Sequence, residues 1–245
     1  MPEEGSSSPS AKPTLPQPLP SLEEGGAGEG TVAGNGSGCT APVIESILLK
    51  GAAGEKVVIA LSDGSSFVLH AEVFARSRIT AGTQVDPDTR ERLLAHSELV
   101  VARIAALRLI ARAAQTRKGL ERKLSARGFS AGAVHHAISC AVELGYLDDH
   151  VFAEAWLRSR MGGRPEGWTA LYKGMLGRGV TRTVAEEVLS AVYTEEVELE
   201  VGRRLADGLS SDSAVRKLAS RGFRSRAIAT VLRELRERDR EHRES

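Results

Sequence analysis

The chain has 245 residues, of which 41% are hydrophobic and 4% aromatic, and its formal net charge is +1. That is enough apolar material for a core built from aliphatic side chains, a composition that favours helices. Two cysteines give no disulfide framework, and no run of 18 apolar residues or signal-peptide pattern is present, so we expect a cytoplasmic protein without a membrane segment.

Residues 1–40 differ in composition from the rest of the chain. They are dominated by Gly, Ser, Pro and Glu, and they hold five acidic side chains against one basic one, Lys12. Such a segment cannot bury enough apolar surface to offset the entropy of ordering, so we predict a disordered tail. The remaining residues carry 32 basic and 27 acidic side chains, a net charge of +5.

Three short runs rich in β-branched residues follow the tail, and they span 43–49, 56–61 and 66–70. The Asp63-Gly64 pair between the second and third runs suits a hairpin turn that needs positive φ. We therefore predict a three-stranded antiparallel β meander.

Helical patterns replace the strand pattern after residue 70. A short helix is predicted at 71–76, and a longer helical pattern spans 90–114. Asp86 and Pro87 offer this longer helix a cap and a proline at the first helical position. The meander and the lead-in helix together are expected to occupy residues 41–101.

An internal repeat organises the rest of the chain. The segment KLSARGF at 123–129 returns as KLASRGF at 217–223, and a weaker copy, MLGRGV, lies at 175–180. Glycine accepts the left-handed conformation just past a helix C-terminus, so each copy marks a tight turn between two helices. One further helical pattern precedes each turn, which predicts three-helix repeats at 102–149, 150–194 and 195–238, with a charged tail at 239–245. Units of this size cannot bury their apolar faces alone, so the predicted fold class is mainly α, with tandem three-helix repeats stacked in an elongated, curved array.

Catalytic and metal-binding signatures are absent from the sequence. It holds no glycine-rich phosphate loop, no His-Glu-x-x-His, no Gly-x-Ser-x-Gly and no Cys-x-x-Cys. The neighbours His135 and His136 would point about 100° apart on a helix, which is poor ligand geometry. The pair Asp148-Asp149 resembles two catalytic carboxylates, but at a helix start capping is much the more common role. We predict no catalytic residue, no metal site and no cofactor.

Basic residues are concentrated between 103 and 127, where eight of them accompany one acidic residue, Glu121. On a helix whose core-facing residues are Leu120 and Leu124, cations lie on the opposite face and its flanks. Such a face suits phosphates or an acidic protein surface. The predicted partner-binding or DNA-binding residues are Arg117, Lys118, Arg122, Lys123 and Arg127, with Arg158 and Arg160 on the helix after Asp149.

Two further features of the sequence bear on contacts with nucleic acid, namely the tryptophans and the helix-turn-helix pattern. Trp156, at apolar spacing from Phe152, is predicted to lie in the core, whereas the sequence leaves the placement of Trp168 open. Sequence-specific reading of DNA by a helix-turn-helix is not expected, because no second helix carries a cluster of Gln, Asn and Arg that reads base edges.

The runs that carry these features resemble the RecX family, bacterial regulators of the RecA recombinase. The resemblance covers about residues 42–238, and its most specific block is L-G-Y-L-D-D-x-x-F-A-x-x-W at 144–156; it also includes ALRLIARAAQTRKGLERKLSARGF at 106–129 and the weaker LYKGMLGRGV at 171–180. It implies a helical protein of tandem three-helix repeats that binds in the groove of the RecA filament on DNA, and we expect the chain to be a monomer. There it would modulate, chiefly inhibit, the ATPase, strand-exchange and coprotease activities of RecA, with weak binding of its own to single- or double-stranded DNA.

The chain departs from the family pattern at two places. It has Arg-Pro-Glu-Gly-Trp at 164–168 where the family often has Arg-Gly-x-Gly-Pro, which changes the loop that enters the second repeat. It has Gly119 where the family often has Glu, which should weaken that helix by up to ~1 kcal/mol.

A second class of function is a sequence-nonspecific DNA-binding protein with no protein target. It predicts tight, strongly salt-dependent binding to DNA alone. The modest charge of the chain after residue 40 makes it the weaker hypothesis. A hydrolase acting on nucleic acid is weaker still, because no metal-binding constellation of carboxylates is present.

Overall fold

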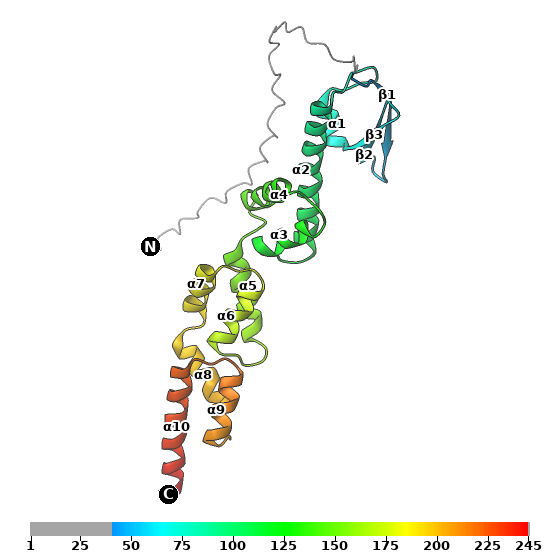
Figure 1. The fold of residues 1–245 in the computed structure, drawn as a ribbon. Coiled ribbons are helices and arrows are strands. Elements are labelled where there is room, and N and C mark those ends of the chain that lie inside the picture. The colour runs from blue at the N-terminus through cyan, green and yellow to red at the C-terminus, as the bar shows by residue number, and fades with distance from the viewer. Residues whose placement is uncertain (1–40, 245) are drawn as a thin grey trace, which may run out of the picture. The chain divides into compact units, whose positions relative to one another are not determined.

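The structure is a computed structural model that describes residues 41–244, with side chains described as far as residue 240 (Figure 1). Three strands and ten helices lie within this range. The chain divides into two compact units, the first comprising residues up to Arg108 together with Leu124–Tyr146, the second comprising Leu109–Lys123 and the residues from Leu147 onward. The predicted tail, residues 1–40, lies outside the described residues.

The first unit contains the predicted antiparallel meander. Its strands, in the order β1-β2-β3, are β1 (Ile44–Lys50), β2 (Lys56–Leu61) and β3 (Ser66–His70). The turn between β2 and β3 uses the predicted pair, because Gly64 has a φ of +79° and the Asp63 carboxylate accepts a hydrogen bond from the Ser65 backbone N–H at 2.9 Å. The meander prediction is confirmed.

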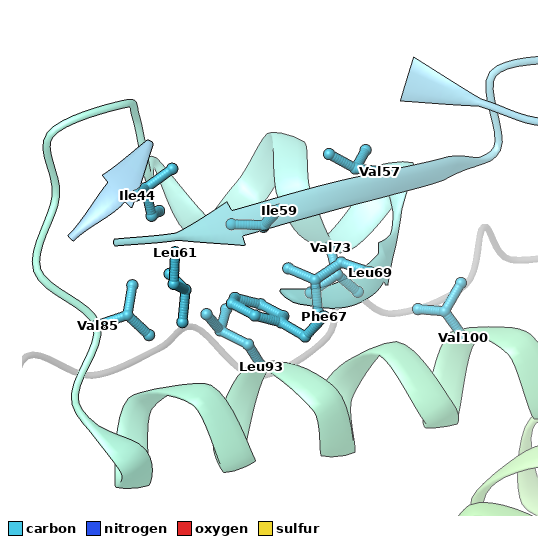
Figure 2. Close-up of a cluster of buried hydrophobic side chains, with 10 residues drawn as sticks. All are labelled: Ile44, Val57, Ile59, Leu61, Phe67, Leu69, Val73, Val85, Leu93 and Val100. Atoms are coloured by element: carbon cyan, nitrogen blue, oxygen red, sulfur yellow. The ribbon is translucent and has the colours of Figure 1, made fainter. Parts of the chain in front are cut away.

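One face of the sheet forms the core of the first unit. Alternate residues of β2 and β3 are buried, which is the period-2 pattern of a sheet with one covered face. They pack against Val73 of α1 (Ala71–Ser77) and against Leu93 and Val100 of α2 (Pro87–Arg112), as Figure 2 shows.

The long helix α2 begins where the sequence predicts. The Asp86 carboxylate accepts hydrogen bonds from the backbone N–H of Thr89 at 2.7 Å and from its hydroxyl at 2.9 Å. The helix then runs without a break to Arg112, so residue 102, the expected start of the first repeat, falls inside it. One helix therefore serves both the sheet core and the first repeat.

The helix α4 (Ala131–Glu143) completes the first unit. The Ser130 hydroxyl caps it by accepting from the Ala133 backbone N–H at 3.3 Å. Glu98 of α2 accepts hydrogen bonds from both the backbone N–H and the hydroxyl of Ser130, each at 2.7 Å. The helix ends before Gly145, whose φ is +72°.

The second unit holds the remaining repeats. Helices α5 (Asp149–Met161), α6 (Trp168–Gly177) and α7 (Arg182–Val192) bury Leu157, Leu171, Met175, Val188 and Leu189 in one apolar cluster. Helices α8 (Glu195–Ala206), α9 (Ser211–Ser220) and α10 (Ser225–Glu244) bury a second cluster, in which α10 packs along α8 and α9 (Figure 1).

The three glycine turns found in the sequence share one backbone conformation. Gly128, Gly179 and Gly222 have φ values of +86°, +92° and +74°, and each lies between two helices of a repeat. The fold class, mainly α with tandem three-helix repeats and a small β meander, is confirmed for residues 41–244. The curvature expected of the array stays a prediction.

Helix α10 runs to Glu244 and includes most of the expected charged tail at 239–245.

Candidate interaction surface

Hydrogen bonds fix the start of α3 (Arg117–Ser125) within the second unit. The buried Thr116 hydroxyl accepts from the Gly119 backbone N–H at 3.0 Å and donates to the Arg178 carbonyl oxygen at 2.7 Å. The Arg117 backbone N–H donates to Asp149 Oδ1 at 2.8 Å. The first turn of α3 is thereby held against the turn that follows α6 and against the start of α5.

Two glycines permit this close approach. A Cβ on Gly119 would lie 2.8 Å from Thr116 Oγ1, and a Cβ on Gly179 would lie 2.9 Å from Lys118 Cβ. Gly119, which departs from the family pattern, therefore stands at a contact where a side chain would meet the Thr116 hydroxyl. Glycine has a low helix propensity, but the absence of a side chain at Gly119 leaves room for the junction between the first two repeats.

The cationic side chains of α3 point away from its buried residues. Leu120 and Leu124 are fully buried, whereas Arg117, Lys118 and Arg122 are exposed. No ion pair or side-chain hydrogen bond joins these three cations to another side chain within residues 41–240. We call Arg117, Lys118 and Arg122 the cationic face. Its charges remain available to a partner.

Lys123 and Arg127 are placed differently from the cationic face. Lys123 Nζ donates to Gln115 Oε1 at 2.6 Å, which holds the lysine against the connection between α2 and α3. Arg127 is exposed in the glycine turn after α3 and belongs to the first unit. That Lys123 and Arg127 contact a partner or DNA stays a prediction.

Arg158 and Arg160 already have acidic partners in the second unit. Arg158 pairs with Glu154 at 2.8 Å, four residues earlier on α5. Arg160 makes two hydrogen bonds to the Glu166 carboxylate, at 2.7 and 2.9 Å. Because their charge is partly neutralised within the chain, these two arginines are weaker candidates than the cationic face.

A pocket of about 600 Å³ opens beside the cationic face. Three helix starts contribute to its wall, those of α3, α5 and α7. Its lining residues are Arg117, Lys118, Glu121, Asp149, Leu176, Gly179, Val180, Thr181 and Arg182. Arg182 was not among the predicted contact residues, because it stands alone in the sequence. The signal that could have found it is the repeat, since it follows the glycine turn that packs on the preceding repeat.

Asp148 and Asp149 have separate roles. Asp148 Oδ1 accepts from the backbone N–H groups of His150 and Val151 at 2.8 and 3.2 Å, so the predicted cap of α5 is Asp148. Asp149 is 9% exposed and binds the Arg117 N–H instead. Burial raises the pKa of the Asp149 carboxyl, and the Arg117 N–H and guanidinium oppose that shift only in part.

Replacing Asp149 with asparagine is expected to stabilise the fold at neutral pH. A carboxyl whose pKa is raised on folding favours the folded state while protonated and loses that contribution as pH rises through the raised pKa. Asparagine stays neutral, and its amide oxygen can still accept from Arg117. Urea unfolding followed by tryptophan fluorescence measures the free energy of unfolding. The value for Asp149→Asn should exceed that of the parent by an amount that increases as pH rises from 4 to 7. A parent that gains stability over the variant along this range would contradict the assignment.

Neither tryptophan forms an open platform for a base. Trp156 packs against the core of the second repeat, as predicted, with the Arg178 guanidinium 4.7 Å from its ring centroid. Trp168 stacks on Tyr172 with ring centroids 4.9 Å apart, and the Arg224 guanidinium covers its ring at 5.5 Å.

No group of three or more His, Cys, Asp or Glu in the part of the chain that the structure describes could hold a metal ion. Across residues 41–244 no helix combines the length and the apolar character needed to cross a membrane.

Comparisons with known proteins identify the family. A family model described as RecX, first three-helix domain, matches residues 102–139. The regulatory protein RecX of Caldanaerobacter subterraneus subsp. tengcongensis is 30% identical over 142 residues, which are 58% of this chain and 72% of that protein. The chain belongs to the RecX family. The RecX of Thermus thermophilus adds a second relative, 40% identical over 118 residues that cover 48% of this chain and 80% of its own.

Solved structures of RecX proteins share the fold. A crystal structure of regulatory protein RecX aligns with a TM-score of 0.61 at 17% identity, covering 78% of this chain and 98% of that one. The crystal structure of RecX from Lactobacillus salivarius gives a TM-score of 0.52 at 23% identity, covering 56% and 96%.

Proposed function

We propose that this chain is a non-enzymatic cytoplasmic regulator that binds the nucleoprotein filament of the RecA recombinase. As a monomer and without a cofactor, it modulates, and mainly inhibits, the ATPase, strand-exchange and coprotease activities of RecA. It thereby regulates DNA repair, recombination and the SOS response. The observation that carries the proposal is membership of the RecX family, whose curated members bear the name regulatory protein.

The cationic face supplies a physical means of binding such a filament. Arg117, Lys118 and Arg122 offer exposed positive charge that is not held in an ion pair with any described side chain. A filament of protein on DNA presents both phosphates and carboxylates, and exposed cations accelerate encounter with either. Tandem repeats suit a periodic target, because equivalent helices recur along the chain as protomers recur along a filament.

Inhibition of ATP hydrolysis requires a preference for one filament state. A bound protein shifts an equilibrium only by its difference in affinity for the two states. We therefore expect the chain to bind the filament state that hydrolyses ATP slowly more tightly than the active state. Binding without this preference would leave the ATPase unchanged.

Reversing two charges of the cationic face tests its part in binding. The double variant Lys118→Glu/Arg122→Glu is expected to bind RecA filaments on single-stranded DNA at least ~10-fold more weakly, since it replaces attraction by repulsion at two exposed positions. Co-sedimentation with preformed filaments measures the affinity, and circular dichroism verifies the helix content.

Lys50→Glu/Lys56→Glu is the matched control for this variant. These two exposed lysines face each other across β1 and β2, and their reversal changes the net charge by the same amount. It should leave binding near the parent value. Equal losses in the two double variants would show that only the total charge matters and would reject the cationic face.

The exposed cations also suit a second function, sequence-nonspecific DNA binding without a protein target. A face that neutralises about three phosphates of single-stranded DNA gives a slope of about −2 when log K is plotted against log salt. Fluorescence anisotropy with single-stranded DNA at several salt concentrations measures that slope. Binding to bare DNA as tight as binding to RecA filaments would favour this second function, whereas much weaker binding to bare DNA would favour the first.

A further inference from the structure

The second unit contains two versions of the same junction between repeats. In the later version, Glu198 of α8 is fully buried and joins the second and third repeats. Its carboxylate accepts from the Trp168 backbone N–H at 3.0 Å, the Arg224 backbone N–H at 3.1 Å and Arg224 Nε at 2.6 Å. The Arg224 guanidinium of the third repeat lies over the Trp168 ring of the second, 5.5 Å from the ring centroid.

The earlier junction is built in the same way but lacks the arginine. By the spacing of the glycine turns, Arg117 corresponds to Trp168, and Thr181 corresponds to Arg224. Asp149, the first residue of α5, is not at the position of Glu198 in the repeat, but its Oδ1 likewise accepts from the N–H that opens the middle helix of the preceding repeat. Asp149 is one methylene shorter than glutamate, and the Arg117 N–H is its only hydrogen-bond donor among the described residues.

The missing side chains leave the pocket beside the cationic face. Thr181 is far smaller than arginine, and Glu121 stands where Tyr172 stacks on Trp168 in the later junction. Both residues line the pocket, together with Asp149. The pocket is therefore the position that the chain fills with its own guanidinium one repeat later.

We propose that this junction pocket receives an arginine side chain from a protein partner. The guanidinium donates to the Asp149 carboxylate, as Arg224 does to Glu198, and Glu121 supplies a second acceptor at the rim. Leu176 and Val180 provide apolar wall for the aliphatic stem. A nucleic acid carries no guanidinium, so the pocket selects the protein component of a nucleoprotein target. In this respect the inference rests on the proposed function.

The rim cations define the surroundings of that arginine. Arg117, Lys118 and Arg182 also line the pocket, but their side chains are exposed on flexible stems. Asp149 is buried and cannot turn away, so the charge fixed inside the pocket is negative while the mobile charge at the rim is positive. An arginine of the partner would pair with Asp149 inside the pocket, and carboxylates next to it in the partner would pair with the cations at the rim. An arginine flanked by other cations would instead be repelled by the rim.

Two substitutions separate an arginine site from an anion site. Thr181→Arg should fill the pocket from within the chain, and Asp149→Asn removes the charged acceptor. Each variant raises the net charge by one, so a site for carboxylates or phosphates would bind more tightly. An arginine site should instead bind RecA filaments about tenfold more weakly in both variants. Filament affinity unchanged or increased in both would overturn the inference.

Ser130→Arg is the matched control. Ser130 holds the position of Thr181 in the first repeat, where Glu98 already accepts from its N–H and hydroxyl, and it lies in the first unit. The variant adds the same charge at the equivalent cap. Filament binding equal to that of the parent is expected, and a loss as large as that of Thr181→Arg would overturn the inference.

A small probe tests the pocket without RecA. N-acetyl-L-argininamide, titrated into the ¹⁵N-labelled full chain, should shift the amide resonances of Lys118 and Gly179 in a saturable way. The shifts should be absent in Thr181→Arg, and N-acetyl-L-glutamate should not reproduce them. A saturable response with no binding to RecA filaments would uphold the pocket and overturn the proposed function. No response, or a response only to the glutamate, would overturn the pocket.

Discussion

Replacing Gly167 with alanine is expected to lower the free energy of unfolding of the second unit by ~3 kcal/mol or more. The added Cβ would lie 2.3 Å from both Cα and N of Phe223 and 2.5 Å from the Gly222 carbonyl oxygen. All three are backbone atoms, which cannot rotate out of the way as a side chain can. The Gly167 N–H also donates to the Arg221 carbonyl oxygen at 2.9 Å, so the loop cannot move off without losing that bond.

Gly177 at the far end of α6 provides the control for Gly167. A Cβ there meets nothing within 4 Å, and alanine favours a helix over glycine, so Gly177→Ala should be neutral or stabilising by up to ~1 kcal/mol. Urea unfolding followed by fluorescence isolates this unit, because Trp156 and Trp168 are the only tryptophans of the chain and both belong to it. Equal effects at the two glycines would contradict the close packing at Gly167.

Replacing Glu198 with alanine is expected to cost ~3 kcal/mol of unfolding free energy. The fully buried carboxylate accepts three hydrogen bonds, two from the backbone N–H groups of Trp168 and Arg224 and one from Arg224 Nε. Its removal leaves the two N–H groups without their acceptor and the Arg224 guanidinium without its counter-charge. The Arg224 side chain is 39% exposed, so water can solvate its guanidinium once Glu198 is removed. The expected loss of unfolding free energy is therefore smaller than for a fully buried ion pair.

Glu200 on the same helix is the control for Glu198. Its side chain is 67% exposed, and it lies 3.9 Å from Arg204, so Glu200→Ala should change the unfolding free energy by no more than ~0.5 kcal/mol. Tryptophan fluorescence in urea measures both variants. A Glu198→Ala protein as stable as Glu200→Ala would show that the buried carboxylate does not hold the second and third repeats together.

Local signals account for the parts of the fold that the sequence predicted. The Asp63-Gly64 turn, the Asp86 cap and the glycine turns of the repeats are set by residues within a few positions of each other. The Ser130 cap, which accepts from the Ala133 N–H three residues later, is equally local. Such features depend on backbone conformation and nearby donors, which a sequence displays directly.

The contacts between repeats were not predictable in the same way. Asp149 binds a backbone N–H 32 residues away, and Glu198 binds one 30 residues away. Neither residue type nor spacing identifies these partners, because the distances depend on how two repeats pack. The altered loop at Gly167 belongs here as well, since its tight contact with Phe223 appears only once the third repeat is in place.

The arrangement of the candidate interaction surface could be predicted in part. The position of Arg117, Lys118 and Arg122 opposite the buried leucines follows from helical spacing. The pairing of Arg158 with Glu154 could also have been found, because the two are four residues apart on one helix. The pairing of Arg160 with Glu166 crosses a loop, and the sequence does not indicate it.

The central claim is that this RecX-family chain acts on RecA, and ATP hydrolysis by RecA on single-stranded DNA tests it most directly. The full chain would be added to preformed filaments at amounts up to one per RecA protomer, with the Lys118→Glu/Arg122→Glu protein in parallel. The account predicts that hydrolysis falls with the parent chain and falls much less with the variant. Hydrolysis that stays unchanged at stoichiometric amounts of the parent chain would contradict it.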